Sequence, residues 1–470
     1  MKQIPTLLIL VTCFIVYLSA DSVITQEARA NKPSAEELED QDVACCPKPF
    51  IKRESICICM PSTGRPLLSR PLEYTRVAFK PYGYIKLDAF YDTRQIIGDR
   101  EEHFLLFPAP YFPDVLGKDI NAHGQYHMNA IETRAGVNIE GPQWGPCVID
   151  GGIEADFRGS SEVSVNCFRM RLAYGFVDWK SGRFLFGEFS HPLYITDCYP
   201  DTVSFNGGAP LDPQARMPQL RVVQRWNQSE LLVAVSSQRG FNSPGPKGLN
   251  AEYIARSKRP DLTAGLRYYF GDNFVGFVVD HKWLTPRLVS ETGYKVDEIL
   301  GSTIAEVYGS YRYAPVSLRA KSFYAQNGAE QILISGYGVS TRDEITDKRT
   351  YANTVAVGGW LDASYIFYCN RMELGFFAGY TKNKGSSKSL YIDPKSDEPI
   401  IYSLVPGVSN KIDSVARFSP RWVWSLDPLR IGVEVEWTRA AFGTPNKFGR
   451  ICNARPVDNV RILGAFYYVF

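Results

Sequence analysis

Charged residues recur at alternating positions in several short segments of the chain. In residues 148–158 the ionisable side chains are Asp150, Glu154, Asp156 and Arg158, and the positions between them are apolar or glycine. Side chains two positions apart point to the same face of a β-strand. These four residues would therefore form one charged surface that can bind and orient ions.

A basic set occupies the equivalent face of other segments. Opposed acidic and basic surfaces across a wet interior would create a transverse field that orients charged solutes, and a surplus of arginine would favour anions. The same charges could instead pair across neighbouring strands and only keep the interior hydrated. The basic residues are Arg169, Arg171, Arg221, Arg225, Arg267, Arg312, Arg319, Lys321, Arg417 and Arg421.

A further group of charges lies in the long connection at residues 191–218. It contains Asp197, Asp201, Asp212 and Arg216. A connection of this length can fold back into a wide interior, where it would narrow a passage and bring its charges to a permeating solute.

Histidine use argues against catalysis. A hydrolase needs a histidine held beside a nucleophile, but the chain has only 5 His and no local motif joins one to a nucleophile. His123 and His127 could offer two metal ligands, although their spacing fixes no geometry on an irregular loop. We therefore expect no catalytic residue, no cofactor and no metal.

Strands must position these charged surfaces. From residue 81 onward, apolar and polar residues alternate with a period of two. The expected strand centres number about sixteen. Brief turns such as 180–182, 227–229 and 271–273 alternate with long connections such as 94–125 and 383–409. The centres lie near residues 87, 133, 152, 173, 186, 223, 234, 266, 278, 308, 320, 360, 376, 417, 434 and 464.

Alternating short and long connections are typical of an antiparallel β-barrel that crosses a membrane, with short periplasmic turns and long extracellular loops. We predict this all-β fold for residues 81–470. Its apolar side chains would face lipid, because charges there are costly. A soluble β-sandwich is the alternative, with the apolar face forming a core. The regular alternation of the connections favours the barrel.

The last segment, residues 457–470, ends in an aromatic residue. Phe466, Tyr468 and Phe470 share one face of the expected strand. This ending resembles the final strand of bacterial outer-membrane barrels, which the barrel-assembly machinery recognises. We expect these three residues to form the assembly signal.

The amino terminus predicts export. Residues 1–20 combine one positive charge, an apolar run and a small-residue end, as a secretory signal peptide does; an acylated Cys13 is an alternative. Residues 21–80 would form a periplasmic segment. The chain has 10 Cys, and nine follow residue 20. A disulfide-stapled knot and a tetrathiolate zinc site are both open for the cluster Cys45, Cys46, Cys57 and Cys59.

Several motifs in residues 81–226 resemble the DcaP-like porins. They are GYIKLDAFYD at 83–92, IGD at 97–99, RLAYG at 171–175, DTVSFNG at 201–207 and RMPQLR at 216–221. The resemblance implies a trimeric outer-membrane diffusion channel that prefers small organic anions such as dicarboxylates. It makes Arg216 and Arg221 expected anion contacts. Residues 21–80 depart from the family, because they lack the heptads of its coiled-coil segment.

The sequence therefore predicts a porin for passive diffusion of small hydrophilic solutes, with a preference for anions. Its partners would be outer-membrane lipid, the assembly machinery and two further copies in a homotrimer, and no nucleic acid. An adhesin or structural barrel, and a lipid-modifying barrel enzyme, are the alternatives.

Overall fold

The computed structural model of the chain describes residues 77–470 except 238–241 and 368–370. The expected signal peptide, nearly all of the expected periplasmic segment, and Cys45, Cys46, Cys57 and Cys59 lie outside the described residues. Among those residues, no helix has the length and apolar character needed to span a membrane.

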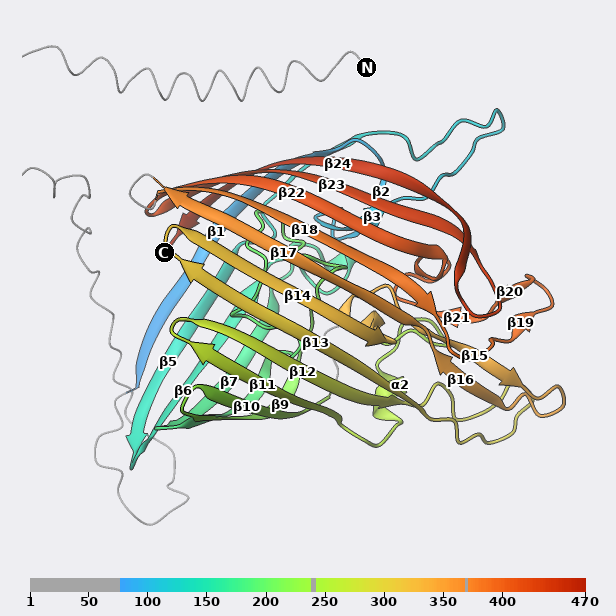
Figure 1. The fold of residues 1–470 in the computed structure, drawn as a ribbon, viewed down its shortest axis with the longest axis horizontal. Coiled ribbons are helices and arrows are strands. Elements are labelled where there is room, and N and C mark those ends of the chain that lie inside the picture. Colours follow the sequence, from blue (N-terminus) through green and yellow to red (C-terminus); the bar gives the residue numbers. More distant parts are fainter. Residues whose placement is uncertain (1–76, 238–241, 368–370) are drawn as a thin grey trace, which may run out of the picture. The chain divides into compact units, whose positions relative to one another are not determined.

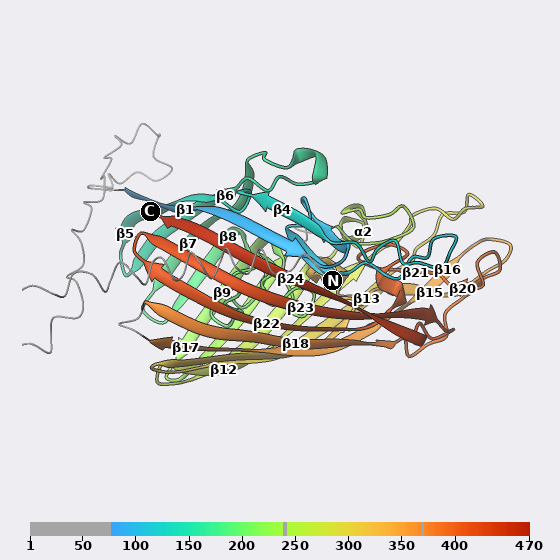
Figure 2. The same cartoon turned by 90° about the horizontal axis from the view of Figure 1, so that it is seen from above.

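A closed antiparallel barrel of 16 strands forms the described part of the chain (Figures 1 and 2). Each strand pairs with the next, and β24 pairs with β1. The prediction of fold and strand number is confirmed. The strands are β1 (Ala78–Asp92), β5 (Arg134–Trp144), β6 (Cys147–Asp156), β7 (Arg169–Trp179), β8 (Gly182–Ser190), β9 (Arg216–Trp226), β10 (Ser229–Ser236), β11 (Asp261–Phe270), β12 (Asn273–Leu284), β13 (Leu300–Tyr313), β14 (Val316–Gln326), β17 (Val355–Phe367), β18 (Met372–Gly385), β22 (Ile412–Leu426), β23 (Leu429–Pro445) and β24 (Ile451–Val469).

The two faces of the barrel wall meet different surroundings. Leu266, Val307 and Leu374 point outward and are 55%, 52% and 52% exposed, whereas the inward Glu306 and Arg461 are 1% and 0% exposed. A soluble sandwich would bury the apolar face and expose the charged one. The observed order is the reverse, as expected for a wall that stands in lipid and encloses a polar interior.

The connections are short at one end of the barrel and long at the other (Figure 1). The sequence predicts a turn over residues 141–146, but the observed turn is tighter, because residues 141–144 belong to β5 and only Gly145 and Pro146 lie between β5 and β6.

The long connections contain short elements that the sequence analysis treated as loops. A strand β4 (Gln125–Asn129) pairs with β1 beyond the end of β5, so the second wall strand is built in two pieces. The other elements are the hairpin of β2 (Ile96–Asp99) and β3 (Phe104–Pro108), the sheet of β15 (Tyr337–Arg342), β16 (Arg349–Asn353) and β21 (Ile401–Tyr402), the pair β19 (Ile392–Asp393) and β20 (Glu398–Pro399), the short helix α2 (Glu252–Ala255), and the 3-10 helices η1 (Glu162–Ser164), η2 (Ala329–Gln331) and η3 (Ser409–Lys411).

The first and last strands close the ring through backbone and side-chain contacts. Gly83 and Phe470 exchange two backbone hydrogen bonds of 3.0 Å each. A side chain at Gly83 would lie only 2.3 Å from the carbonyl oxygen of Arg134, so this position requires glycine. Deeper in the wall, Arg461 binds Asp92 at 2.7 Å with both side chains buried. We call this β1–β24 junction the seam.

Candidate functional site

The connection between β8 and β9 lies inside the barrel, where strands from around the wall bind its backbone. Its carbonyl oxygens accept hydrogen bonds from Lys86 of β1, Lys321 of β14 and Arg417 of β22. The distances are 2.9 Å to Val203, 3.0 Å to Leu193 and 2.5 Å to Ala209. We call residues 191–215 the inward segment.

Two other connections join the inward segment in the interior. Strand β3 and residues 329–334 pack against it, and Asn206 accepts a 2.7 Å hydrogen bond from the Leu105 backbone. The shared core is apolar, although the sequence predicted that the inner face of the wall is charged and borders a wet interior. Because close-packed side chains exclude solvent, this part of the interior leaves no room for a wide pore. The wall residues of the core include Val278, Ile304, Phe323, Trp360, Phe377 and Val415.

Asp212 fastens the inward segment to the wall. Its carboxylate lies 2.7 Å from the Lys321 ammonium and accepts a 2.8 Å hydrogen bond from the Trp360 indole. The side chain is only 1% exposed. The sequence predicted that Asp212 contacts a solute, but in the structure its carboxylate binds Lys321 and Trp360.

We expect Asp212→Ala to loosen the inward segment without opening the wall. After the change, Lys321 keeps its hydrogen bond to Leu193 and its contact with Glu306 at 3.6 Å. The inward segment should therefore lose only about 1–2 kcal/mol of stabilising free energy, which corresponds to roughly a tenfold faster amide exchange. Hydrogen–deuterium exchange of residues 191–215 measures it. Asp197→Ala is the matched control, because Asp197 is 60% exposed where it binds Arg267. Equal protection in both variants would contradict the anchoring role.

Four arginines surround a small cavity between the inward segment and the wall. Arg100 follows β2, Arg158 follows β6, and Arg169 and Arg216 begin β7 and β9. The cavity has a volume of about 40 Å³, enough for a water molecule or a small polar group. We call these four residues the arginine cluster.

Only part of the positive charge of the arginine cluster is neutralised. Asp99 pairs with Arg100, and Asp156 pairs with Arg169 at 2.7 Å. Arg158 and Arg216 form no ion pair with any described residue. Arg158 instead lies flat over the Phe205 ring, with its guanidinium carbon 3.7 Å from the ring centre.

Burial and mutual repulsion act on the two loop arginines of the cluster. Burial, with the nearby charge of Arg169, lowers the pKa of Arg100 to about 10. Burial also lowers the pKa of Arg158, and the charges of Arg100 and Arg169 lower it further. An anion in the cavity would relieve this repulsion and form charge-assisted hydrogen bonds with the guanidinium groups.

The predicted acidic surface and its nearest arginines lie side by side. Asp156 accepts hydrogen bonds from Arg169 and Arg171, and Glu154 accepts one of 2.7 Å from Arg171. Because β6 and β7 are neighbours in the sheet, these acidic and basic residues pair across adjacent strands and do not form opposed walls, which is the second of the two arrangements that the sequence left open. Asp150 lies nearer the short turn and accepts a 3.2 Å hydrogen bond from the Gly141 backbone.

The remaining predicted residues lie apart from the cavity. Arg221 donates to the Gln219 side chain at 2.9 Å and to the Ser190 carbonyl. Arg225 binds Glu230 at 2.6 Å. Asp197 binds Arg267 at 2.7 Å, and Asp201 lies 3.8 Å from Arg319. Of the two arginines that the family resemblance singled out, only Arg216 therefore lines the cavity.

Arg100 is the member of the arginine cluster that sequence reasoning missed. It lies at a bend with a positive φ of 55°, outside any strand. Strand periodicity carries no information about such a position. Arg158, in contrast, was already on the predicted charged face of its segment.

A buried group near the inward segment has the composition of a metal site. Asp88, His103 and Glu132 offer ligand atoms within 4.8 Å of one another. Lys86 already occupies this group, with its ammonium 3.2 Å from Asp88 and in contact with Glu132. Because the lysine supplies the positive charge that the two carboxylates require, a metal ion would have to displace it. We therefore regard the group as an internal ion-pair network.

Comparisons with known proteins bear on the fold. No family model and no curated protein matches the chain. Among solved structures, the outer-membrane channel DcaP of Acinetobacter baumannii is 16% identical, with a TM-score of 0.59 over 84% of this chain and 97% of that one.

Two further solved structures have lower TM-scores. An anion-selective porin from Comamonas acidovorans is 8% identical, with a TM-score of 0.50 over 84% of this chain and 100% of that one. The trimer form of the outer-membrane protein OmpT of Vibrio cholerae is 12% identical, with a TM-score of 0.50 over 85% and 100%. The described part of the chain thus has the fold of the DcaP-like outer-membrane porins.

Proposed function

We propose that this chain is an outer-membrane channel for passive diffusion of small hydrophilic solutes, with a preference for small organic anions such as dicarboxylates. The observation that carries the proposal is the arginine cluster, in which Arg158 and Arg216 lack an acidic partner among the described residues. Unmatched arginines beside a polar cavity lower the energy of an anion and raise that of a cation. The channel would work without a cofactor and without catalysis.

The surroundings of the cluster support a restricted passage. The inward segment, β3 and residues 329–334 fill part of the interior, and the cavity at the cluster has a volume of about 40 Å³. A solute larger than water would have to displace side chains there. We infer a channel for a narrow class of solutes, with Arg158 and Arg216 as the first contacts for a carboxylate.

The location and assembly of the chain belong to the same proposal. The apolar outer face fits a bilayer, and the resemblance of the barrel to outer-membrane porins supports an outer-membrane location. Residues 1–20 would direct the export that this location requires. Phe466, Tyr468 and Phe470 would address it to the assembly machinery. A homotrimer is proposed from the trimer form of the similar Vibrio cholerae protein.

Planar-bilayer recording of the refolded full chain tests the channel role. We expect discrete conductance steps and a reversal potential in a KCl gradient that indicates anion preference. Added succinate should reduce the chloride current, because both anions would use the arginine cluster. The absence of steps would contradict the channel role and favour an adhesin or structural barrel, while lipid hydrolysis by the same sample would favour an enzyme.

A further inference from the structure

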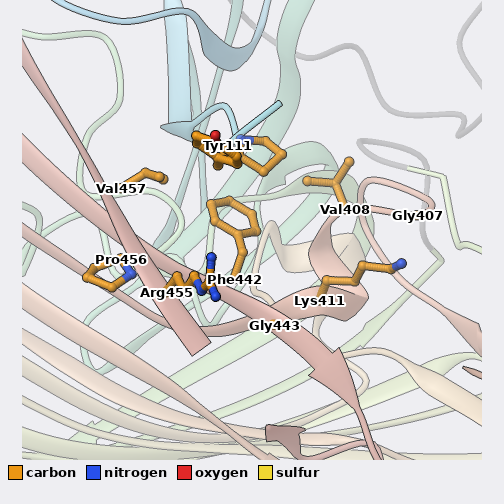
Figure 3. Close-up of a pocket in the computed structure, with 10 residues that line it drawn as sticks. Tyr111, Gly407, Val408, Lys411, Phe442, Gly443, Arg455, Pro456 and Val457 are labelled. Atoms are coloured by element: carbon orange, nitrogen blue, oxygen red, sulfur yellow. The ribbon is translucent and has the colours of Figure 1, made fainter. Parts of the chain in front are cut away.

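A larger cavity is lined by residues of the long connections and of the β23–β24 hairpin (Figure 3). It shares no lining residue with the cavity at the arginine cluster. It has a volume of about 360 Å³ and lies between Tyr111, the connection that contains Val408 and the β23–β24 hairpin. Phe442 and Val457 supply much of its remaining wall. Cavities of this size with apolar and aromatic walls are typical of sites for small organic molecules.

Two basic residues line this cavity, and only one of them is committed to a partner. Lys411 binds Glu398 at 2.9 Å. The Arg455 side chain forms no ion pair or hydrogen bond with any described residue, and it lies beside Phe442 (Figure 3). A guanidinium group binds carboxylates through two parallel hydrogen bonds. The cavity is half open to solvent and combines apolar walls with one available cation.

We propose that this cavity binds a small aromatic monocarboxylate, with the carboxylate at Arg455 and the ring against Tyr111 and Phe442. A dicarboxylate fits less well, because Lys411 is already paired with Glu398 and a second carboxylate would lose water against Val408 or Val457. A neutral aromatic molecule would keep the ring contacts and lose the ionic one. Binding at this outer cavity does not depend on the proposed channel role.

Isothermal titration calorimetry of the refolded full chain in detergent tests the proposal. We expect saturable binding of phenylacetate at pH 7 with a dissociation constant of about 1 mM, as suits a ligand of this size. Phenylacetamide has the same ring without the charge and should bind about tenfold more weakly. Succinate should also bind more weakly than phenylacetate at this cavity. The absence of saturable phenylacetate binding would overturn the proposal.

Variants assign the binding to individual residues. Arg455→Gln should reduce phenylacetate affinity about tenfold, to the level of phenylacetamide, and leave phenylacetamide binding unchanged. Tyr111→Ala should weaken both ligands equally. Arg450→Gln is the matched control, because Arg450 lies on the same hairpin outside the cavity and should change neither. Equal phenylacetate affinity in Arg455→Gln and the unchanged protein would overturn the proposal. This outcome does not depend on whether the bilayer recordings show a channel.

Discussion

Replacement of Arg158 and Arg216 by glutamate should reverse the ion preference of the channel. The double change converts the two members of the arginine cluster that have no acidic partner among the described residues into two carboxylates, a change of about four charges beside a cavity of about 40 Å³. Because fields at a narrow passage are weakly screened, we expect the anion-to-cation permeability ratio to fall by about tenfold or more. Reversal potentials in a KCl gradient measure this ratio.

Matched variants show whether the effect on ion preference depends on where in the barrel the arginine is replaced. Arg312→Glu makes the same replacement at an exposed position of β13, near the short turn to β14, and should leave the ratio nearly unchanged. Arg158→Gln removes the positive charge without adding a buried carboxylate, so it serves as the test when Arg158→Glu does not fold. It should also lower the anion-to-cation permeability ratio. Arg221→Glu should have a smaller effect than Arg216→Glu, because Arg221 lies apart from the cavity. An unchanged ratio in the double variant would remove the assigned role of the cluster.

Loss of the Arg461 guanidinium should strongly destabilise the seam. Arg461→Ala removes the guanidinium from the Asp92 carboxylate, which is 0% exposed, and leaves Asn459 as its only side-chain donor among the described residues. Breaking a buried ion pair from one side typically costs about 3–5 kcal/mol. We expect a clear fall in the urea midpoint of the refolded barrel, measured by tryptophan fluorescence.

The pair formed by Arg439 and Asp458 gives the control for the seam. It joins β23 to β24 with the same residue types at 2.8 Å, but its side chains are 48% and 42% exposed. Exposed pairs of this kind contribute at most about 1 kcal/mol, so Arg439→Ala should move the midpoint little. Equal shifts in the two variants would mean that burial of the Asp92–Arg461 pair has no special role.

Most of the barrel wall was predictable from the sequence, because period-two alternation depends on local residue order alone. Phe466 and Tyr468 point outward at 51% and 40% exposure, while Arg461 and Ala465 point inward at 0%, as the alternation required. The short turns were predictable for the same reason. Their bounds differ by a few residues, since turn residues such as Gly141 can also extend a strand.

The interior was less predictable, because it depends on which distant segments meet. Val278 and Phe323 are apolar and point inward, so their strands carry apolar residues on both faces. The alternation of apolar and polar residues along these strands does not explain the apolar side chains of the inner face. The reason is the inward segment, which packs on them. Asp212 was recognised as a charge but not as an anchor, since Lys321 is 109 residues away.

The seam has a consequence for the kinetics of assembly. Asp92 and Arg461 are 369 residues apart, so their contact has about the highest loop-closure entropy cost that this chain can incur. Neighbouring strands can pair early to form hairpins, whereas β1 can pair with β24 only after all the hairpins between them have formed. Until that union, two unpaired strand edges invite aggregation, and a catalyst that shields those edges would accelerate the slowest step of maturation.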